Sequence, residues 1–350
     1  MKKSLIALAA LAASSAFAQS SVTIWGIADA GVAKQSQNGV SKTYLSSSGF
    51  NSSQLGFKGT EDLGGGLKAS FWLEAGMTID NGTAAGVAFQ RRSTVDLAGN
   101  FGAIRLGRDY TPTFWSHTVF DAFGTLGSGA GSNITLTGFN GNATTAARTN
   151  NGVSYLYNVA ANGGSHGLGS QGLYAQVTHA YGEQLSTAAA QTGQYDGARV
   201  GYAAGKFNVA VATGKTVTGA TTKDTVNNIG ASYDLGVAQL MAFTVSTKIG
   251  TTGITHKASE VSAKIPMGSG YIPVSFATGS NNTNAAKGEQ FAIGYVYNLS
   301  PRTSLYTAYS KITNKNGGAY TFLGGNGGFN GGLTAAGNGT GFDLGVKHSF

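Results

Sequence analysis

The residues of this sequence best suited to bind ions are arginines, and they are unevenly placed. Five of the seven lie between residues 91 and 148: Arg91, Arg92, Arg105, Arg108 and Arg148. A guanidinium group is always charged, and its planar set of donors suits carboxylate and phosphate groups. A ring of such groups in a narrow passage would concentrate anions and repel cations.

Other patterns that could carry chemistry are weak. The chain has no Cys, and its five histidines show no metal-ligand spacing with carboxylates, so we expect neither a metal site nor a cofactor. Residues 167–172 (GLGSQG) fit G-x-G-x-x-G, but no dinucleotide-binding unit surrounds them, which predicts a glycine-rich turn. No serine, acid and histidine constellation can be assembled, so we expect no catalytic residues and no enzyme.

Composition sets the class of protein in which these arginines must be placed. The chain has 350 residues, 55 of them Gly, with 11% charged and 10% aromatic residues and a net charge of +8. Soluble domains carry roughly 25% charged residues and about 7% Gly, and disordered chains are poor in aromatic residues. The net charge could indicate nucleic-acid binding, but the lysines are scattered along the sequence without a patch, so no nucleic-acid partner is expected.

The first 18 residues have the features of a secretory signal. Lys2 and Lys3 precede an apolar run, and small residues lie two positions apart at Ala16 and Ala18. Cleavage there predicts a mature domain over residues 19–350 with a net charge of +6, because both lysines are removed. No later stretch reaches the ~20 apolar residues that a transmembrane helix requires.

The elements that position the arginines are predicted by alternation. Over residues 67–80, Leu67, Ala69, Phe71 and alternate residues to Ile79 form one face, and Lys68, Ser70 and alternate residues to Asp80 form the other. This period of two is typical of a β-strand with one apolar face. A strand needs only about 9–11 such residues to cross a bilayer.

Sixteen segments of this kind can be counted along the chain. They lie around residues 21–33, 52–61, 67–80, 87–98, 103–110, 150–158, 172–182, 197–205, 206–215, 226–236, 237–248, 256–266, 270–279, 289–298, 303–313 and 340–350. Short glycine-containing links alternate with long polar ones, which lie at 34–51, 81–86, 111–149, 183–196, 216–225, 249–255, 280–288 and 314–339.

An even number of alternating strands, with long links at one end, predicts a 16-stranded antiparallel transmembrane β-barrel. Sixteen strands leave a water-filled lumen, whereas about eight are filled by side chains. A soluble β-sandwich or β-solenoid would also alternate, but neither explains why the long links all follow odd-numbered strands. A charged side chain on the lipid-facing side costs about 2–4 kcal/mol at the midplane, so charged strand residues are expected in the lumen.

Several motifs resemble those of Gram-negative general porins of the β-proteobacterial type, and most closely the anion-selective porins of that group. The motifs are residues 20–32 (SSVTIWGIADAGV), 55–69 (LGFKGTEDLGGGLKA), 91–99 (RRSTVDLAG), 101–109 (FGAIRLGRD) and 345–350 (GVKHSF). The likeness covers both ends of the chain and is densest over residues 52–125. The middle of the chain matches mainly by the rhythm of its strands.

The resemblance implies a homotrimer of barrels in the outer membrane, each with its third long loop folded inward. Here that constriction loop is about residues 111–149, in which Asp121 is the only acid. Its aromatic residues are suited to anchor it against the inner wall: Phe114, Trp115, Phe120 and Phe123. The alternative is an exposed, mobile loop. Phe350 resembles the signal that the outer-membrane assembly machinery reads in this family.

Parity assigns some arginines to the lumen, and the resemblance assigns others. Arg105 and Arg148 lie opposite outward apolar residues, so both should face water. The family's constriction cluster corresponds to Arg91, Arg148 and a third position, which in this sequence is Gln54. Strict alternation selects Arg92 in place of Arg91, and a bulge would reverse that assignment, so both remain candidates.

The remaining candidates for the constriction carry charges near this cluster. Lys58 or Lys68 is suited to offset in part the charge lost at Gln54, whereas Glu74 and Asp121 match acidic positions that face the family's cluster. Arg108 is a further basic candidate. The alternative for all these charges is a structural ion-pair network or an exposed rim.

These observations predict a passive outer-membrane diffusion channel for ions and small hydrophilic solutes, with an arginine-lined constriction that favours anions. Expected partners are copies of the same chain, outer-membrane lipid and lipopolysaccharide, the assembly machinery, and small anionic or hydrophilic solutes. Alternatives from other classes are a barrel enzyme of the lipase or protease type, and an adhesin or autotransporter. The latter would need a passenger domain, and the predicted barrel uses the whole mature chain.

Overall fold

The structure, a computed structural model, describes residues 21–82, 87–136, 147–159, 171–283, 286–323 and 337–350. The predicted signal at 1–18 and most of the turn at 167–172 lie outside these residues. The strands are β1 (Ser21–Gln37), β2 (Val40–Ser47), β3 (Gln54–Gly64), β4 (Leu67–Gly76), β5 (Arg92–Gly99), β6 (Gly102–Tyr110), β7 (Arg148–Tyr157), β8 (Gly172–Ala180), β9 (Tyr195–Ala204), β10 (Phe207–Val217), β11 (Lys223–Asp234), β12 (Gln239–Lys248), β13 (Thr255–Met267), β14 (Gly270–Asn281), β15 (Lys287–Asn298), β16 (Thr303–Lys315) and β17 (Gly339–Ser349).

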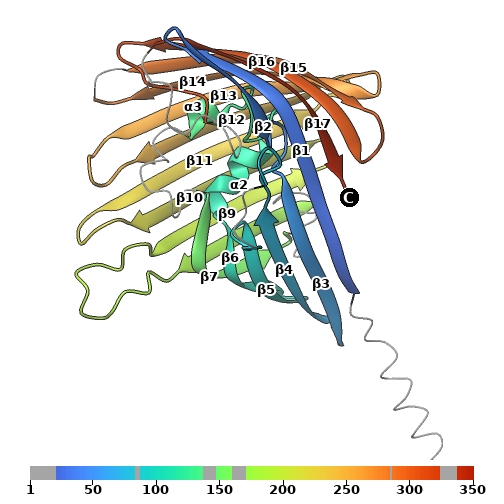
Figure 1. Ribbon diagram of the computed structural model, residues 1–350. Coiled ribbons are helices and arrows are strands. Elements are labelled where there is room, and N and C mark those ends of the chain that lie inside the picture. Colours follow the sequence, from blue (N-terminus) through green and yellow to red (C-terminus); the bar gives the residue numbers. More distant parts are fainter. Residues whose placement is uncertain (1–20, 83–86, 137–146, 160–170, 284–285, 324–336) are drawn as a thin grey trace, which may run out of the picture.

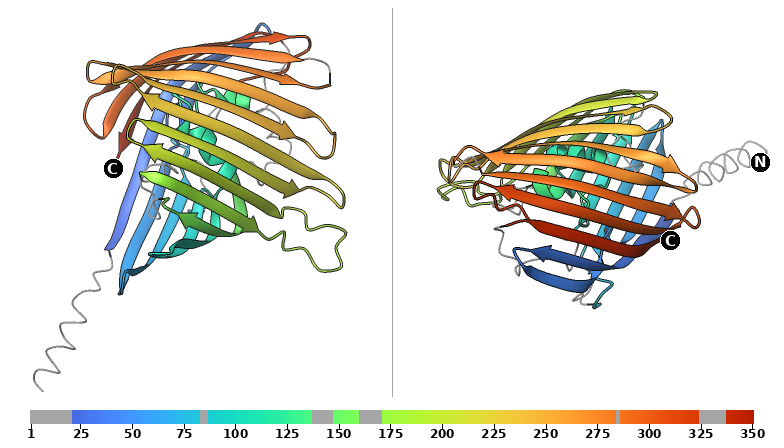
Figure 2. Two further views of the ribbon diagram at one scale, coloured as in Figure 1. Left: turned by 180° about the vertical axis from the view of Figure 1, so that it is seen from behind. Right: turned by 90° about the horizontal axis from the view of Figure 1, so that it is seen from above.

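The strands form one closed antiparallel sheet (Figures 1 and 2). Closure is made by β17, which pairs with β1 along eleven positions, for example Val32 with Leu344. β1 pairs with β2 beside its second half and with β3 beside its first half. β2 and β3 are therefore two parts of one barrel strand, and the barrel has the predicted sixteen strands.

The two faces of the sheet have opposite character. On β5, the outward side chains of Val95 and Leu97 are 60% and 40% exposed, whereas inward Asp96 between them is 3% exposed. The same pattern of exposed apolar and buried polar residues recurs along most strands. A water-soluble domain shows the reverse arrangement, so the outer face is built for a lipid environment.

The third long connection lies inside the barrel, as predicted. It contains two helices, α2 (Pro112–Val119) and α3 (Ser132–Thr135). α2 contacts β8, β9, β10 and β11, and α3 contacts β13, β14 and β15, so the described part of the connection crosses the lumen (Figures 1 and 2). Among the described residues, neither helix is long and apolar enough to span a membrane.

Local chemistry explains where this connection begins and how it is fixed. Thr111 caps α2 by accepting a hydrogen bond from the Phe114 amide, and Pro112 occupies the first turn, where its missing N–H costs nothing. Phe120 and Ile134 are fully buried in a cluster with Phe243 and Val245 of the inner wall. The anchoring by aromatic residues is therefore confirmed for the part of the loop that the structure describes.

Three predicted boundaries were wrong, and one of them is the end of β4, which lies at Gly76 and not at Asp80. Residues 34–51 were predicted to form a long polar link, yet β1 continues to Gln37, turns at Asn38 and Gly39, and pairs with β2. The sequence of β2, VSKTYLSS, does not alternate apolar and polar residues over its whole length, so a search for a period of two misses it. The segment predicted at 87–98 begins as a strand only at Arg92, so residues 87–91 approach the barrel wall without joining the sheet.

Candidate pore constriction

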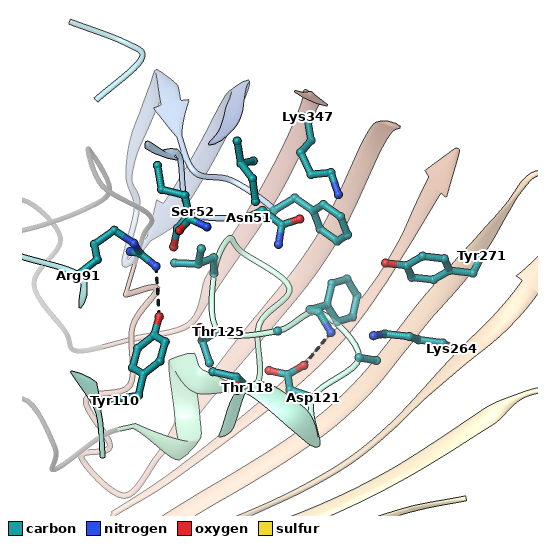
Figure 3. Close-up of a pocket in the computed structure, with 17 residues that line it drawn as sticks. Asn51, Ser52, Arg91, Tyr110, Thr118, Asp121, Thr125, Lys264, Tyr271 and Lys347 are labelled. Carbon is teal, nitrogen blue, oxygen red and sulfur yellow. Dashed lines mark hydrogen bonds between the residues drawn. The ribbon is translucent and has the colours of Figure 1, made fainter. Parts of the chain in front are cut away.

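Two adjoining cavities lie where the third long loop faces the barrel wall. The central cavity holds about 300 Å³ and the arginine cavity about 280 Å³. Both are lined by Ile27, Gln54, Arg91 and Tyr110, which places them side by side. Figure 3 shows Arg91 and Tyr110 on one side of the central cavity and Lys264, Tyr271 and Lys347 on the other.

Arg91 and Arg148 converge on the hydroxyl of Tyr110. Arg91 donates to this oxygen at 3.2 Å and Arg148 at 2.8 Å, while the Arg148 Nε also donates to the Arg91 carbonyl at 2.7 Å. The Arg148 guanidinium lies 4.3 Å from the centre of the Tyr110 ring, a cation–π contact. The two guanidinium groups are thus fixed side by side although 57 residues separate them.

Tyr110 owes its position to the start of the third loop. Its ring stacks on Phe114 and meets Trp115 edge-on, both with centroids 4.9 Å away. Because α2 carries both of these aromatic residues, the loop and the arginine pair are positioned together.

The structure places both Arg91 and Arg92 on the inner side. Arg92 faces inward by strand alternation, together with Thr94 and Asp96. Arg91 precedes the strand, so the alternation of strand residues does not determine the direction of its side chain. This side chain pairs with Glu74 at 2.5 Å and lines both cavities. The alternation argument and the family correspondence therefore each identified an inward residue.

Arg92 and Arg105 belong to a buried ion-pair network. Arg105 donates to both oxygens of Asp96 at 2.9 Å and to Asp109 at 2.6 Å, and Arg92 lies 3.6 Å from Asp109. Arg92 also stacks over Trp72 at 4.7 Å. Two carboxylates offset two guanidinium groups here, so these arginines stabilise the wall and add little net charge to the lumen.

The other predicted residues divide by position. Gln54 lines both cavities, and Lys58 lines the arginine cavity with its ammonium 5.0 Å from the Trp72 ring. Lys68 is exposed near the short turn at Gly66 and lines neither cavity. Arg108 is half-buried, donates to the Gln90 carbonyl and the Asn150 side chain, and lines neither cavity.

Asp121 lines the central cavity from the loop side, where its carboxylate is largely buried. It accepts hydrogen bonds from the amides of Phe123 at 2.8 Å and Gly131 at 2.9 Å, and it contacts the carboxyl group of Glu260. Burial raises the pKa of the Asp121 carboxyl to about 7, and Lys264 opposes this shift. The acid is therefore a weaker negative charge than its residue type suggests.

Sequence reasoning missed two basic residues of the central cavity, Lys264 on β13 and Lys347 on β17. Both lie on the polar side of their strands, and parity alone would have identified them as inward. Neither lysine belongs to a motif of the family, so no signal other than parity distinguished it from the other lysines of the chain. Among the described residues, no group of His, Asp and Glu has the arrangement of a metal site.

A closed barrel with an apolar outer face and a polar, charged lumen defines an outer-membrane channel protein. The chain matches the model of the Gram-negative porin family over residues 4–317 and belongs to that family. It is 39% identical to outer membrane porin protein 32 of Delftia acidovorans over the full length of both chains. It is 43% identical to the major outer membrane protein P.IB of Neisseria gonorrhoeae, over 32% of this chain and 33% of that protein.

Solved structures agree. An anion-selective porin from Comamonas acidovorans superimposes with a TM-score of 0.81 at 34% identity, covering 95% of this chain and all of that one. The OmpF porin of Salmonella typhi matches with a TM-score of 0.69 at 17% identity, covering 94% and 97%, which shows the shared fold. The chain is thus an outer-membrane porin, and its relatives are channels and not enzymes.

Proposed function

We propose that the channel favours anions, and that the arginine pair with Lys264 and Lys347 forms its selective constriction. The observation that carries the proposal is the charge of the central cavity: three basic side chains line it, Arg91, Lys264 and Lys347, against one acid, Asp121. Arg148 lines neither cavity itself, but it donates to the hydroxyl of Tyr110, which lines both, and so adds a fourth positive charge beside them. Its described partners are a carbonyl and a hydroxyl, which neutralise no charge.

The roles of the remaining candidates follow from their partners. Glu74 accepts from Arg91 and from the Trp72 indole at 3.1 Å, so it holds the arginine in place at the expense of some positive charge. Gln54 contributes a neutral amide where the family pattern has a basic residue, and Lys58 supplies charge to the adjoining cavity. Arg92 and Arg105 act as wall residues. Lys68 and Arg108 line neither cavity, and no role in ion selection is proposed for them.

The Comamonas acidovorans porin that superimposes on this chain is anion-selective, which agrees with the proposal. In a passage lined by low-dielectric walls, a fixed surplus of positive charge raises the local concentration of anions. Small hydrophilic solutes would pass down their gradients with no energy source, cofactor or catalytic residue.

Reconstitution in a planar bilayer under a KCl gradient tests both parts of the proposal. Stepwise currents with an anion-type reversal potential are expected. A cation-type potential would contradict the selectivity, and a bilayer without current steps would contradict the channel itself.

Replacing Arg148 is the sharper test of the constriction. Arg148→Glu changes the local charge by two units beside Arg91, so we expect the reversal potential to move toward the cation value. Arg302→Glu makes the same change at an exposed short turn and should leave the potential unchanged. Equal shifts in the two variants would place Arg148 outside the ion path.

Assembly as a homotrimer with a cleaved signal at 1–18, typical of the family, is proposed here as well. Phe350 exchanges backbone hydrogen bonds with Gly26 at 3.0 Å and leaves its ring 50% exposed. An exposed aromatic group at the chain end is accessible to the assembly machinery before the barrel closes.

We further infer that lipopolysaccharide binds the outer face near the long connections. Eight exposed lysines lie on that face: Lys34, Lys215, Lys223, Lys248, Lys257, Lys287, Lys311 and Lys315. Three acids lie at the same end, Glu183 and Asp196 in exposed positions and Glu289, which pairs with Lys315 at 2.9 Å. Exposed charges at the opposite end are balanced, with three basic and three acidic residues: Glu61, Asp62, Lys68, Lys206, Asp234 and Arg302.

These lysines are brought together by strand register. Lys257 pairs across Ser280 with Lys287, which pairs with Lys315, so three ammonium groups occupy one lateral row on β13, β15 and β16. Exposed apolar residues such as Val261 on β13 and Phe291 on β15 lie a few positions further along the same strands. A basic row above an apolar belt fits the phosphates and acyl chains of an anionic glycolipid.

A further inference from the structure

The barrel wall is interrupted at one place that the third loop does not explain. β2 ends at Ser47 and β3 begins at Gln54, although both belong to one barrel strand. Between them the chain leaves the sheet. Ser48 adopts a left-handed backbone with φ of 72°, a conformation that a non-glycine residue holds only where its surroundings enforce it.

A buried carboxylate on β1 holds this excursion. Asp29 is 0% exposed, and its oxygens accept from the amides of Gly49 at 3.2 Å, Phe50 at 3.1 Å and Asn51 at 2.6 Å. Its fourth partner is the Tyr306 hydroxyl at 2.7 Å. Three consecutive amides around one carboxylate form an anion-binding nest, so one side chain determines the path of the excursion.

Serine residues close the two ends of the same excursion. The Ser48 amide donates to the Asp29 carbonyl at 2.9 Å. The Ser53 hydroxyl donates to that carbonyl at 2.9 Å and accepts from the Asp29 amide at 3.0 Å. The backbone of β1 is therefore the template on which residues 48–53 are folded.

The excursion projects into the central cavity. Phe50, Asn51 and Ser52 line it, and Figure 3 shows Asn51 and Ser52 across the cavity from Thr118 and Asp121 of the loop. The Phe50 ring stacks on the Tyr306 ring with centroids 5.4 Å apart. The Lys347 ammonium lies 5.7 Å from the centroid of the Phe50 ring. Phe50 is thereby fixed beside one of the basic residues of the cavity.

The excursion and the third loop also touch. A Cβ atom added to Gly127 of the loop would collide with the Gly49 carbonyl, so the two backbones approach as closely as glycine allows. Phe50 and Leu126 line one further small cavity beside this contact. The two elements therefore enclose the bore from both sides and meet at Gly49 and Gly127.

We propose that residues 49–52 form a second constriction element, which Asp29 positions and whose Phe50 ring limits the bore. The proposal rests on the proposed channel function and adds a size-determining residue to it. The basic residues determine the preference for anions, whereas residues 49–52 determine in part the width of the passage.

Phe50→Ala tests the steric role. Removing the ring should raise single-channel conductance in KCl and admit larger neutral sugars in liposome swelling, while the sign of the reversal potential stays the same. Phe276→Ala removes an identical ring from the lipid-facing side of β14, where Phe276 is 44% exposed, and should leave conductance unchanged. Unaltered conductance and sugar cut-off in Phe50→Ala would overturn the proposal, whereas a wild-type protein without current steps would overturn the channel function.

Asp29→Asn tests the positioning role, because the amide keeps the size of the side chain and loses the charge that binds three amides. We expect higher conductance and noisier open-channel current from protein whose strand content, measured by circular dichroism, equals that of the wild type. Asp234→Asn is the control, since Asp234 holds only the Gly236 amide at a short exposed turn. Quiet current at wild-type conductance in Asp29→Asn would contradict the proposal that Asp29 positions residues 49–52. If Asp29→Asn fails to fold, Phe50→Ala decides the proposal.

Discussion

At the scale of single residues, the arginines differ by their partners and not by their chemistry. Arg105 gives its donors to two carboxylates, whereas Arg148 gives them to a carbonyl and a phenol hydroxyl. The first guanidinium is neutralised within the wall and the second keeps its full charge. Alternation predicts that both face inward, but it cannot predict which carboxylate lies within reach.

Asp121 allows a pH-dependence prediction. Burial raises the pKa of its carboxyl from 3.8 to about 7, and the ionisable groups that face it are the Glu260 carboxyl and the Lys264 ammonium. A raised pKa means that the folded state binds the proton more tightly, so this contribution to stability is complete below pH 3.8 and is lost as pH rises to about 7.

The unfolding temperature of the detergent-solubilised protein should therefore fall as pH rises through this window. Asp121→Asn should remove that part of the slope, because the amide is neutral throughout. Asp62→Asn, at an exposed turn, is the control and should keep the wild-type slope. A slope in Asp121→Asn that equals the wild-type slope would assign it to other groups.

At the scale of elements, the strands were predictable and the lumen contacts were not. The period of two located sixteen strands because lipid demands apolar residues on one face of each. The excursion at residues 48–53 depends on Asp29 and Tyr306, which are distant in sequence, so no local pattern indicates it. The basic residues Lys264 and Lys347 were on the predicted polar face, yet their meeting in one cavity follows from closure.

Some glycines of the strands mark places where the third loop rests on the wall. A Cβ atom on Gly230 of β11 would collide with the ring of Phe120, the residue that follows α2. The role of Gly230 could not be read from the sequence, because the ring that it accommodates belongs to a segment more than one hundred residues away.

Gly230→Ala should therefore push Phe120 and α2 away from the wall. Overpacking of this kind costs about 1–3 kcal/mol, so we expect a lower unfolding temperature and altered conductance. Ala231→Val adds bulk at the next position on the outward face and should change neither quantity. If both variants behave alike, the contact between Gly230 and Phe120 does not determine the loop position.

At the scale of the whole molecule, the positive charge has two separate locations. One part lies in the lumen, around Arg91 and Arg148. The other lies outside, where lysines that look scattered in the sequence form a row because strand register places Lys257, Lys287 and Lys315 side by side. The sequence predicted no basic patch, and the folded barrel has one at the end with the long connections.

The outer row predicts a measurable affinity for phosphorylated lipid. Each lysine near an anionic surface contributes about 1 kcal/mol, so a variant with Lys257→Gln, Lys287→Gln and Lys315→Gln should bind diphosphoryl lipid A about 100-fold more weakly. The affinity can be measured at low salt from the rise in unfolding temperature as lipid A is titrated into the protein. A variant with Lys68→Gln, Lys206→Gln and Arg302→Gln loses the same charge at the opposite end and should bind like wild type. Equal losses in the two variants would show that net charge, and not the row of lysines, determines binding.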